Sequence, residues 1–72
     1  MHMTYERDGD EAYLHLVDRA DERESPAYQM FRLQGEAFLF FDLDKHGKVL
    51  GMRFELASTV LPQEVLDRAP QP

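Results

Sequence analysis

The chain has no cysteine among its 72 residues, and this absence excludes several classes of protein. Without cysteine there is no disulfide framework, no cysteine-ligated zinc site and no cysteine nucleophile. A chain of this length buries only about 60% of the surface that its unfolded form exposes. Because disulfides are absent, oligomerisation is the usual remaining way to add buried surface.

Basic residues and long apolar runs are also scarce. The chain has 8 Lys and Arg against 14 Asp and Glu, which gives a formal net charge of −6. This charge repels phosphate backbones and argues against direct nucleic-acid binding; it would suit a small basic protein as a partner, or simply keep the chain in solution. No run approaches the ~20 apolar residues of a membrane span, and the first residues do not resemble a signal peptide. We therefore expect a cytoplasmic protein with no membrane partner.

The strongest local pattern predicts a β-hairpin between Ala37 and Leu56. Two apolar, strand-like segments flank the sequence Asp44-Lys45-His46-Gly47, in which Asp-x-x-Gly is typical of a type I turn closed by a residue with positive φ. If Gly47 takes that position, Asp44 lies opposite Lys48, and the register of the whole hairpin follows.

That register predicts which side chains share each face of the hairpin. Phe38 would face Phe54, Phe40 would face Met52 and Asp42 would face Leu50. One face would then hold Phe38, Phe40, Leu50, Met52 and Phe54, and the other Leu39, Phe41, Leu43, Val49, Gly51 and Arg53. Gly51 would lie beneath the ring of Phe41. Since both faces are largely apolar, the second needs a cover, either from the Met3 to Gln34 strands or from another copy.

The remaining segments predict a small mixed fold. Strand-like pieces at Met3 to Glu6 and Ala12 to Val17 would form a first hairpin, and Ala27 to Gln34 also alternates. The charged stretch from Asp18 to Ser25 reads as a solvated loop, and a short helix follows Pro62 with Val65, Leu66 and Ala69 on one face. We expect one α+β domain over residues 1–72, with a meander-like antiparallel sheet of four or five strands and one short C-terminal helix.

Two stretches carry a resemblance to a known family. Tyr5-Glu6-x-x-x-Asp10-x-Ala12-Tyr13-Leu14 is followed by Asp42-x-Asp44-x-x-Gly47-Lys48-Val49-Leu50-Gly51-Met52 and by Ala57-Ser58. Together they resemble the small bacterial domain-of-unknown-function family number 2283. The resemblance implies a small α+β domain without an established activity, and an antitoxin-like role beside a small toxin. The middle segment from Glu24 to Phe41 is longer than in that family, and Arg53 stands where an acidic residue is common.

Two groups of polar residues are candidate sites. Asp42, Asp44, His46 and Gly47 imitate the start of a calcium loop, but the position that needs a bidentate Glu holds Arg53, so neither a metal site nor another cofactor is expected. The second group is Asp10, Tyr13 and His15. A carboxylate near a phenol could bind a ligand or transfer a proton. Alternatively, Asp10 accepts turn N–H groups while Tyr13 packs, and His15 is a surface side chain.

Two functions follow from this sequence. The first is a non-catalytic protein-interaction module that forms a homo-oligomer through an apolar sheet face carrying Leu39, Phe41, Leu43 and Val49. The alternative is a small-molecule-binding protein or minor enzyme that uses Asp10, Tyr13 and His15. A closed polar pocket around Asp10 and Tyr13 would favour the alternative, because the interaction module needs none.

Overall fold

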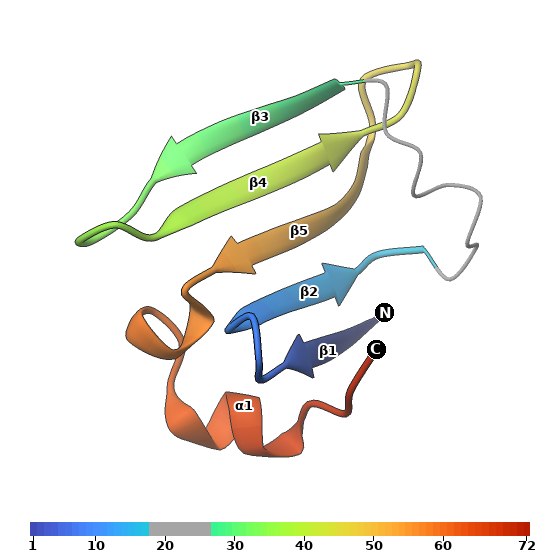
Figure 1. Cartoon of the computed structure of the whole chain (residues 1–72). Helices are drawn as coiled ribbons and strands as arrows, with labels where there is room; N and C mark the ends of the chain where they lie inside the picture. The colour runs from blue at the N-terminus through green and yellow to red at the C-terminus, as the bar shows by residue number, and fades with distance from the viewer. Residues whose placement is uncertain (18–26) are drawn as a thin grey trace.

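The computed structural model describes residues 1–17 and 27–72 as a small α+β fold (Figure 1). Its five strands are β1 (His2–Glu6), β2 (Glu11–His15), β3 (Ala27–Arg32), β4 (Phe38–Leu43) and β5 (Val49–Glu55). A 3-10 turn, η2 (Ala57–Thr59), and a short helix, α1 (Gln63–Arg68), complete the described part. The fold class predicted from the sequence is confirmed. The solvated loop predicted at Asp18 to Ser25 lies outside the described residues.

The five strands form one antiparallel sheet in the order β1-β2-β5-β4-β3. Strands β3, β4 and β5 follow one another as a meander, and the first hairpin, β1-β2, joins it through the pairing of β2 with β5. The last strand in the sequence is therefore the central strand of the sheet. The N-terminal strands extend the sheet beside β5, so they do not fold across the hairpin of β4 and β5.

The turn between β4 and β5 has the predicted chemistry. Gly47 has a φ of 80°, and the Asp44 N–H donates to the Lys48 carbonyl at 2.8 Å. The Asp44 carboxylate accepts the N–H groups of Lys48 and His46 at 2.9 and 2.8 Å. The bond from Lys48, together with that from His46, holds the pKa of Asp44 below its ordinary value. These contacts account for the Asp-x-x-Gly pattern without a bound ion.

Beyond the turn, the predicted register is wrong by one residue. Leu43 still pairs with Val49, but a β-bulge intervenes and Asp42 pairs with Gly51 rather than with Leu50. A bulge places an extra residue on one strand, so every later side chain changes its partner and face. Phe40 consequently lies opposite Arg53, not Met52.

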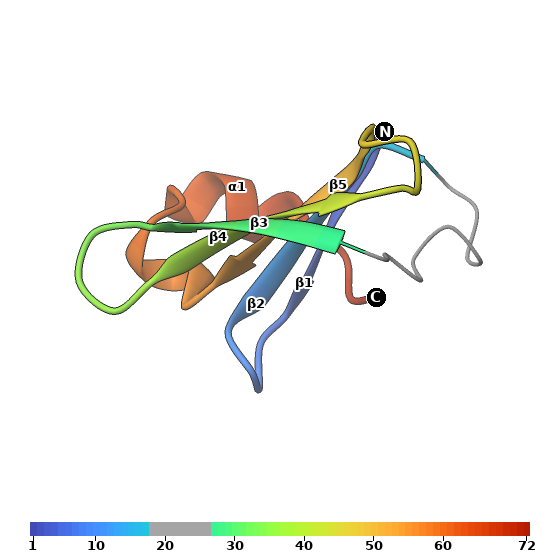
Figure 2. The same cartoon turned by 90° about the horizontal axis from the view of Figure 1, so that it is seen from above.

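The corrected register divides the strand residues into two faces of unlike chemistry. The first, which we call the helix face, carries Met3, Tyr5, Ala12, Leu14, Gln29, Phe31, Leu39, Phe41, Met52 and Phe54. The second, the open face, carries His2, Thr4, Glu6, Glu11, Tyr13, His15, Tyr28, Met30, Arg32, Phe38, Phe40, Asp42, Gly51, Arg53 and Glu55. Figure 2 shows α1 on one side of the sheet. Each charged side chain of the described strands belongs to the open face.

The hydrophobic core lies between the helix face and α1, near the first hairpin. Its buried residues are Tyr5, Ala12, Ala57 and Leu66, and Met3, Phe54, Leu61 and Ala69 pack against it. A helix of this length is unstable alone, so packing holds it in place. Leu66, only 2% exposed, is the residue that docks it, whereas Val65, which was predicted to share that face, is 36% exposed.

Candidate functional site

Asp10 connects the turn of the first hairpin to η2. Its backbone has a positive φ of 53°, and its carbonyl accepts the Ala57 N–H at 2.8 Å. Its carboxylate accepts the Ser58 N–H at 2.9 Å, the Ser58 hydroxyl at 2.6 Å and the Tyr5 hydroxyl at 2.7 Å. Asp10 thus accepts N–H groups, as the second interpretation of the sequence predicted. The donors, however, are Ala57 and Ser58 of η2 rather than residues of the turn, and Ser58 is 48 residues away in sequence.

The same contacts set the protonation of Asp10 and Tyr5. Partial burial raises the pKa of the Asp10 carboxyl, but the hydrogen bonds from Ser58 and Tyr5 outweigh burial and hold that pKa below its ordinary value. The bond to Asp10 raises the pKa of the Tyr5 hydroxyl. At neutral pH Asp10 is therefore a charged acceptor that links three donors of the fold.

Tyr13 lies on the open face and has a different carboxylate partner. Its hydroxyl donates to Oδ2 of Asp42 at 2.7 Å, and Asp42 is buried. The expected pairing of Asp10 with Tyr13 is thus not formed, because Asp10 binds Tyr5 and Ser58 on the other side of the sheet. Asp10 and Tyr13 are only three residues apart in sequence. Asp10 lies in the turn before β2, and the alternation of side chains along β2 places Tyr13 on the opposite face of the sheet.

Tyr13 also explains the glycine in β5. A Cβ at Gly51 would lie 2.5 Å from Cε1 of Tyr13 and 2.7 Å from the Leu14 carbonyl oxygen. An aromatic ring covers Gly51, as predicted, but it comes from Tyr13 on β2 and not from Phe41. The prediction failed for two reasons. The bulge places Phe41 opposite Met52, on the other face of the sheet from Gly51, and the prediction left out β2, whose His15 is the second neighbour of Gly51.

His15 lies beside Tyr13, so the structure brings these two predicted residues together. Their ring centroids are 4.6 Å apart, and His2 stacks on His15 at 4.5 Å. Nε2 of His15 is 3.3 Å from the Thr4 hydroxyl. A depression of about 100 Å³ lies here, lined by Thr4, Glu6, Glu11, Tyr13, His15 and Pro72. Asp10 does not line it.

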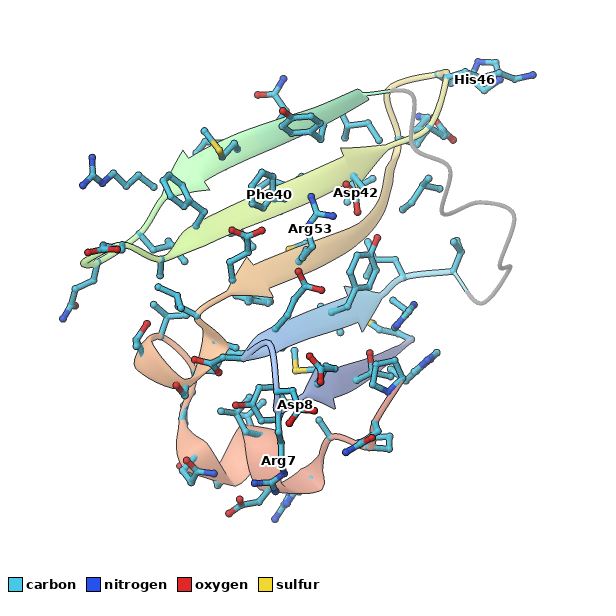
Figure 3. All side chains as sticks on the ribbon, viewed as in Figure 1. Arg7, Asp8, Phe40, Asp42, His46 and Arg53 are labelled. Atoms are coloured by element: carbon cyan, nitrogen blue, oxygen red, sulfur yellow. The ribbon has the colours of Figure 1, made fainter. Side chains whose placement is uncertain are left out.

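Arg53 occupies the middle of the open face, a position that sequence reasoning missed. Its guanidinium carbon is 4.4 Å from the centroid of the Phe40 ring, a cation–π contact (Figure 3). Its Nε is buried and has no hydrogen-bond partner in the described part of the chain. Phe40 also contacts the rings of Tyr28 and Phe38. The predicted register placed Arg53 with Phe41. Gly51, an isolated glycine within a strand and next to the bulge, is a local sequence signal that could have indicated the shift.

Two of the four residues predicted as an interface, Leu39 and Phe41, lie on the helix face. Leu43 continues their alternation along β4 and pairs with Val49 beyond the bulge. Phe31 extends the group onto β3, with its ring centroid 5.5 Å from that of Phe41. We call Phe31, Leu39, Phe41, Leu43 and Val49 the outer patch. In the described residues, the core beneath α1 includes none of them, and Phe31 and Val49 are 49% and 41% exposed.

Within residues 1–17 and 27–72, no group of three or more acidic, histidine or cysteine side chains could hold a metal ion. In the same residues, no helix is long and apolar enough to cross a membrane.

Comparison with known proteins adds no relative. No family model matches the chain, and neither a curated protein nor a solved structure matches it.

Proposed function

We propose that this chain is a non-catalytic protein-interaction module that self-associates through the outer patch. The observation that supports the proposal is the position of this patch, on the same face of the sheet as α1 but outside the core that α1 covers. Contiguous apolar surface of this kind, bordered by polar residues, commonly marks an interaction site.

The distribution of charge favours a second copy as the occupant. The charged residues of the described strands lie on the open face, so the helix face of each copy presents Phe31, Leu39 and Phe41 without a charged neighbour on the strands. Two such faces can pack together without burying an unpaired charge, which would be costly. Closed two-fold pairing is the commonest arrangement for identical chains.

The open face supports the alternative function less well. Small-molecule sites are typically clefts of about 300–1,000 Å³, and the depression beside Tyr13 and His15 has only about 100 Å³. Its acid/base hypothesis also required Asp10, which instead binds Tyr5 and Ser58. The interaction module requires neither a pocket nor that pair.

Sedimentation equilibrium tests the proposal. We expect the wild type to sediment above the monomer mass at micromolar concentration and Phe41→Glu to shift the mass towards the monomer, because the variant places a charge in the centre of the outer patch. Val65→Glu adds the same charge at a partly exposed position of α1, outside the patch, and should leave the mass unchanged. Circular dichroism of each variant separates dissociation from unfolding. A wild type that remains monomeric at high concentration would refute the proposal.

A further inference from the structure

We infer that β3 pairs antiparallel with β3 of a second copy, about a two-fold axis that passes through Met30. The two sheets would then join edge to edge into one continuous sheet. This contact builds on the proposed self-association and adds to it a second surface, whose register the backbone determines.

The two edges of the sheet are not equivalent. At the β1 edge, the chain after α1 returns beside the strand, and the Tyr5 N–H donates to the Pro70 carbonyl at 2.8 Å. Both chain ends lie at this edge (Figure 1). At the opposite edge, β3 is exposed, with Tyr28 61% and Met30 53% accessible.

Strand β3 has little of the usual protection of an edge. Natural edge strands discourage pairing with charged side chains, lysine above all, or with proline, a bulge or a very short length. The sequence of β3, Ala-Tyr-Gln-Met-Phe-Arg, has one charged residue, Arg32, but neither lysine nor proline, and its register with β4 is regular. It carries no acidic residue either, so the negative charge of the chain is not concentrated at this edge.

The hairpin with β4 determines which backbone groups of β3 point outward. The Leu33 N–H donates to the Ala37 carbonyl at 2.8 Å. In an antiparallel pair, such hydrogen-bonded positions recur at every second residue, so Phe31 and Gln29 direct their backbone groups toward β4. Tyr28, Met30 and Arg32 therefore direct theirs toward the free edge.

A partner strand must oppose these outward residues with outward residues of its own. An axis through Met30 satisfies this condition along the whole strand, because it pairs Met30 with Met30 and Tyr28 of each copy with Arg32 of the other. Arg32 then lies beside an aromatic ring, and such cross-strand pairs add stability. An axis through Gln29 would leave Arg32 without an outward partner in β3. An axis through Phe31 would leave Tyr28 without one.

A single-cysteine variant reads this register directly, since the natural chain has no cysteine to interfere. Opposed residues in a hydrogen-bonded pair have Cα atoms about 5.5 Å apart, which suits a disulfide, whereas diagonal neighbours are about 7–8 Å apart and do not. We expect Met30→Cys to form a disulfide-linked dimer under mild oxidation in native buffer, and not in denaturant. Gln29→Cys, on a neighbour that is also exposed, should remain a monomer on a non-reducing gel.

The outcomes distinguish this inference from the proposed function. Cross-linking of Gln29→Cys in preference to Met30→Cys would overturn the register. A wild type that sediments as an oligomer sensitive to Phe41→Glu, with no cross-linking of Met30→Cys, would overturn the edge contact and leave the outer patch as the interface. If Met30→Cys cross-links, and neither Phe41→Glu nor Val65→Glu changes the sedimentation mass, the result would support the edge contact and refute the outer patch.

Discussion

Asp10 shows how much of this fold depends on a single carboxylate. It lies in the first turn of the chain and binds Ser58 in η2, so it connects the N-terminal hairpin with the segment that leads to α1. Tyr5, which donates to the same carboxylate, is also part of the core. Asp10, which the sequence suggested as a candidate site residue, here connects the first hairpin to η2 through hydrogen bonds from Tyr5 and Ser58.

The hydrogen bonds to the Asp10 carboxylate should make the stability of the protein depend on pH. The pKa of Asp10 is lower in the folded state than the ordinary value of about 3.9, so its contribution is present above that value and is lost as pH falls through the folded pKa. Asp10→Asn keeps a residue that tolerates positive φ but removes the charge. We expect a loss of about 1 kcal/mol at pH 7, and a smaller loss of stability than in the wild type on acidification.

Urea unfolding of both proteins from neutral pH to about pH 2 measures this difference. Ser58→Ala is a useful comparison, because it removes one donor and leaves the carboxylate with the Ser58 N–H and Tyr5. Parallel pH profiles for the wild type and Asp10→Asn would show that another group controls the acid sensitivity.

At the scale of the element, α1 is a short helix whose position depends on one side chain. Leu66 is the largest fully buried side chain of the described residues, and it belongs to the core with Tyr5 and Ala12. The helix has Glu64 in its first turn and Arg68 in its last, which suits its dipole but contributes only tenths of a kcal/mol each. Packing therefore outweighs helix propensity here.

Leu66→Ala should lower the free energy of unfolding by about 2–5 kcal/mol, because it leaves a cavity in a small core. Val65→Ala, at a partly exposed position of the same helix, should cost much less. Chemical denaturation of the two variants under the same conditions measures the contrast. Equal small losses would mean that α1 does not dock on the sheet.

The elements that the sequence predicted well are those with local signals. The turn at Gly47 and the first hairpin follow from residues near one another in the chain, and both are confirmed. The β4-β5 register was wrong because the bulge beside Leu43 depends on three-dimensional packing rather than on a turn residue. The strand order also escaped prediction, since the pairing of β2 with β5 joins distant segments.

The positions of the candidate residues were predicted in part for the same reason. Tyr13 and His15 lie two apart on a strand, so alternation alone places them on one face, and the structure brings their rings together. The partner of Tyr13 is Asp42, 29 residues away, and only the order of the strands makes that contact. Arg53 could not be assigned to Phe40 without knowledge of the bulge.

At the scale of the whole molecule, the sheet separates charge from apolar surface. In the described strands, Glu6, Glu11 and Glu55 lie on the open face with Arg53, and the helix face has none. With a net charge of −6, the chain can remain dispersed in water through one face while the other associates. The outer patch and the β3 edge both lie in the half of the sheet away from α1.

The hydrogen bond between Tyr5 and Pro70 limits how far edge pairing can proceed. A sheet with two free edges can add chains at both ends and grow into a fibril. Here the Pro70 carbonyl already accepts the Tyr5 N–H at the other edge, so pairing through β3 consumes the remaining edge and edge-to-edge growth of the sheet stops at two chains. A chain that ends at Ala69 should therefore form thioflavin-positive fibrils on prolonged incubation, whereas one that ends at Pro70 should not. Residues 70–72 would then limit edge-to-edge growth of the sheet, a role that depends on the Pro70 carbonyl group and not on side chains.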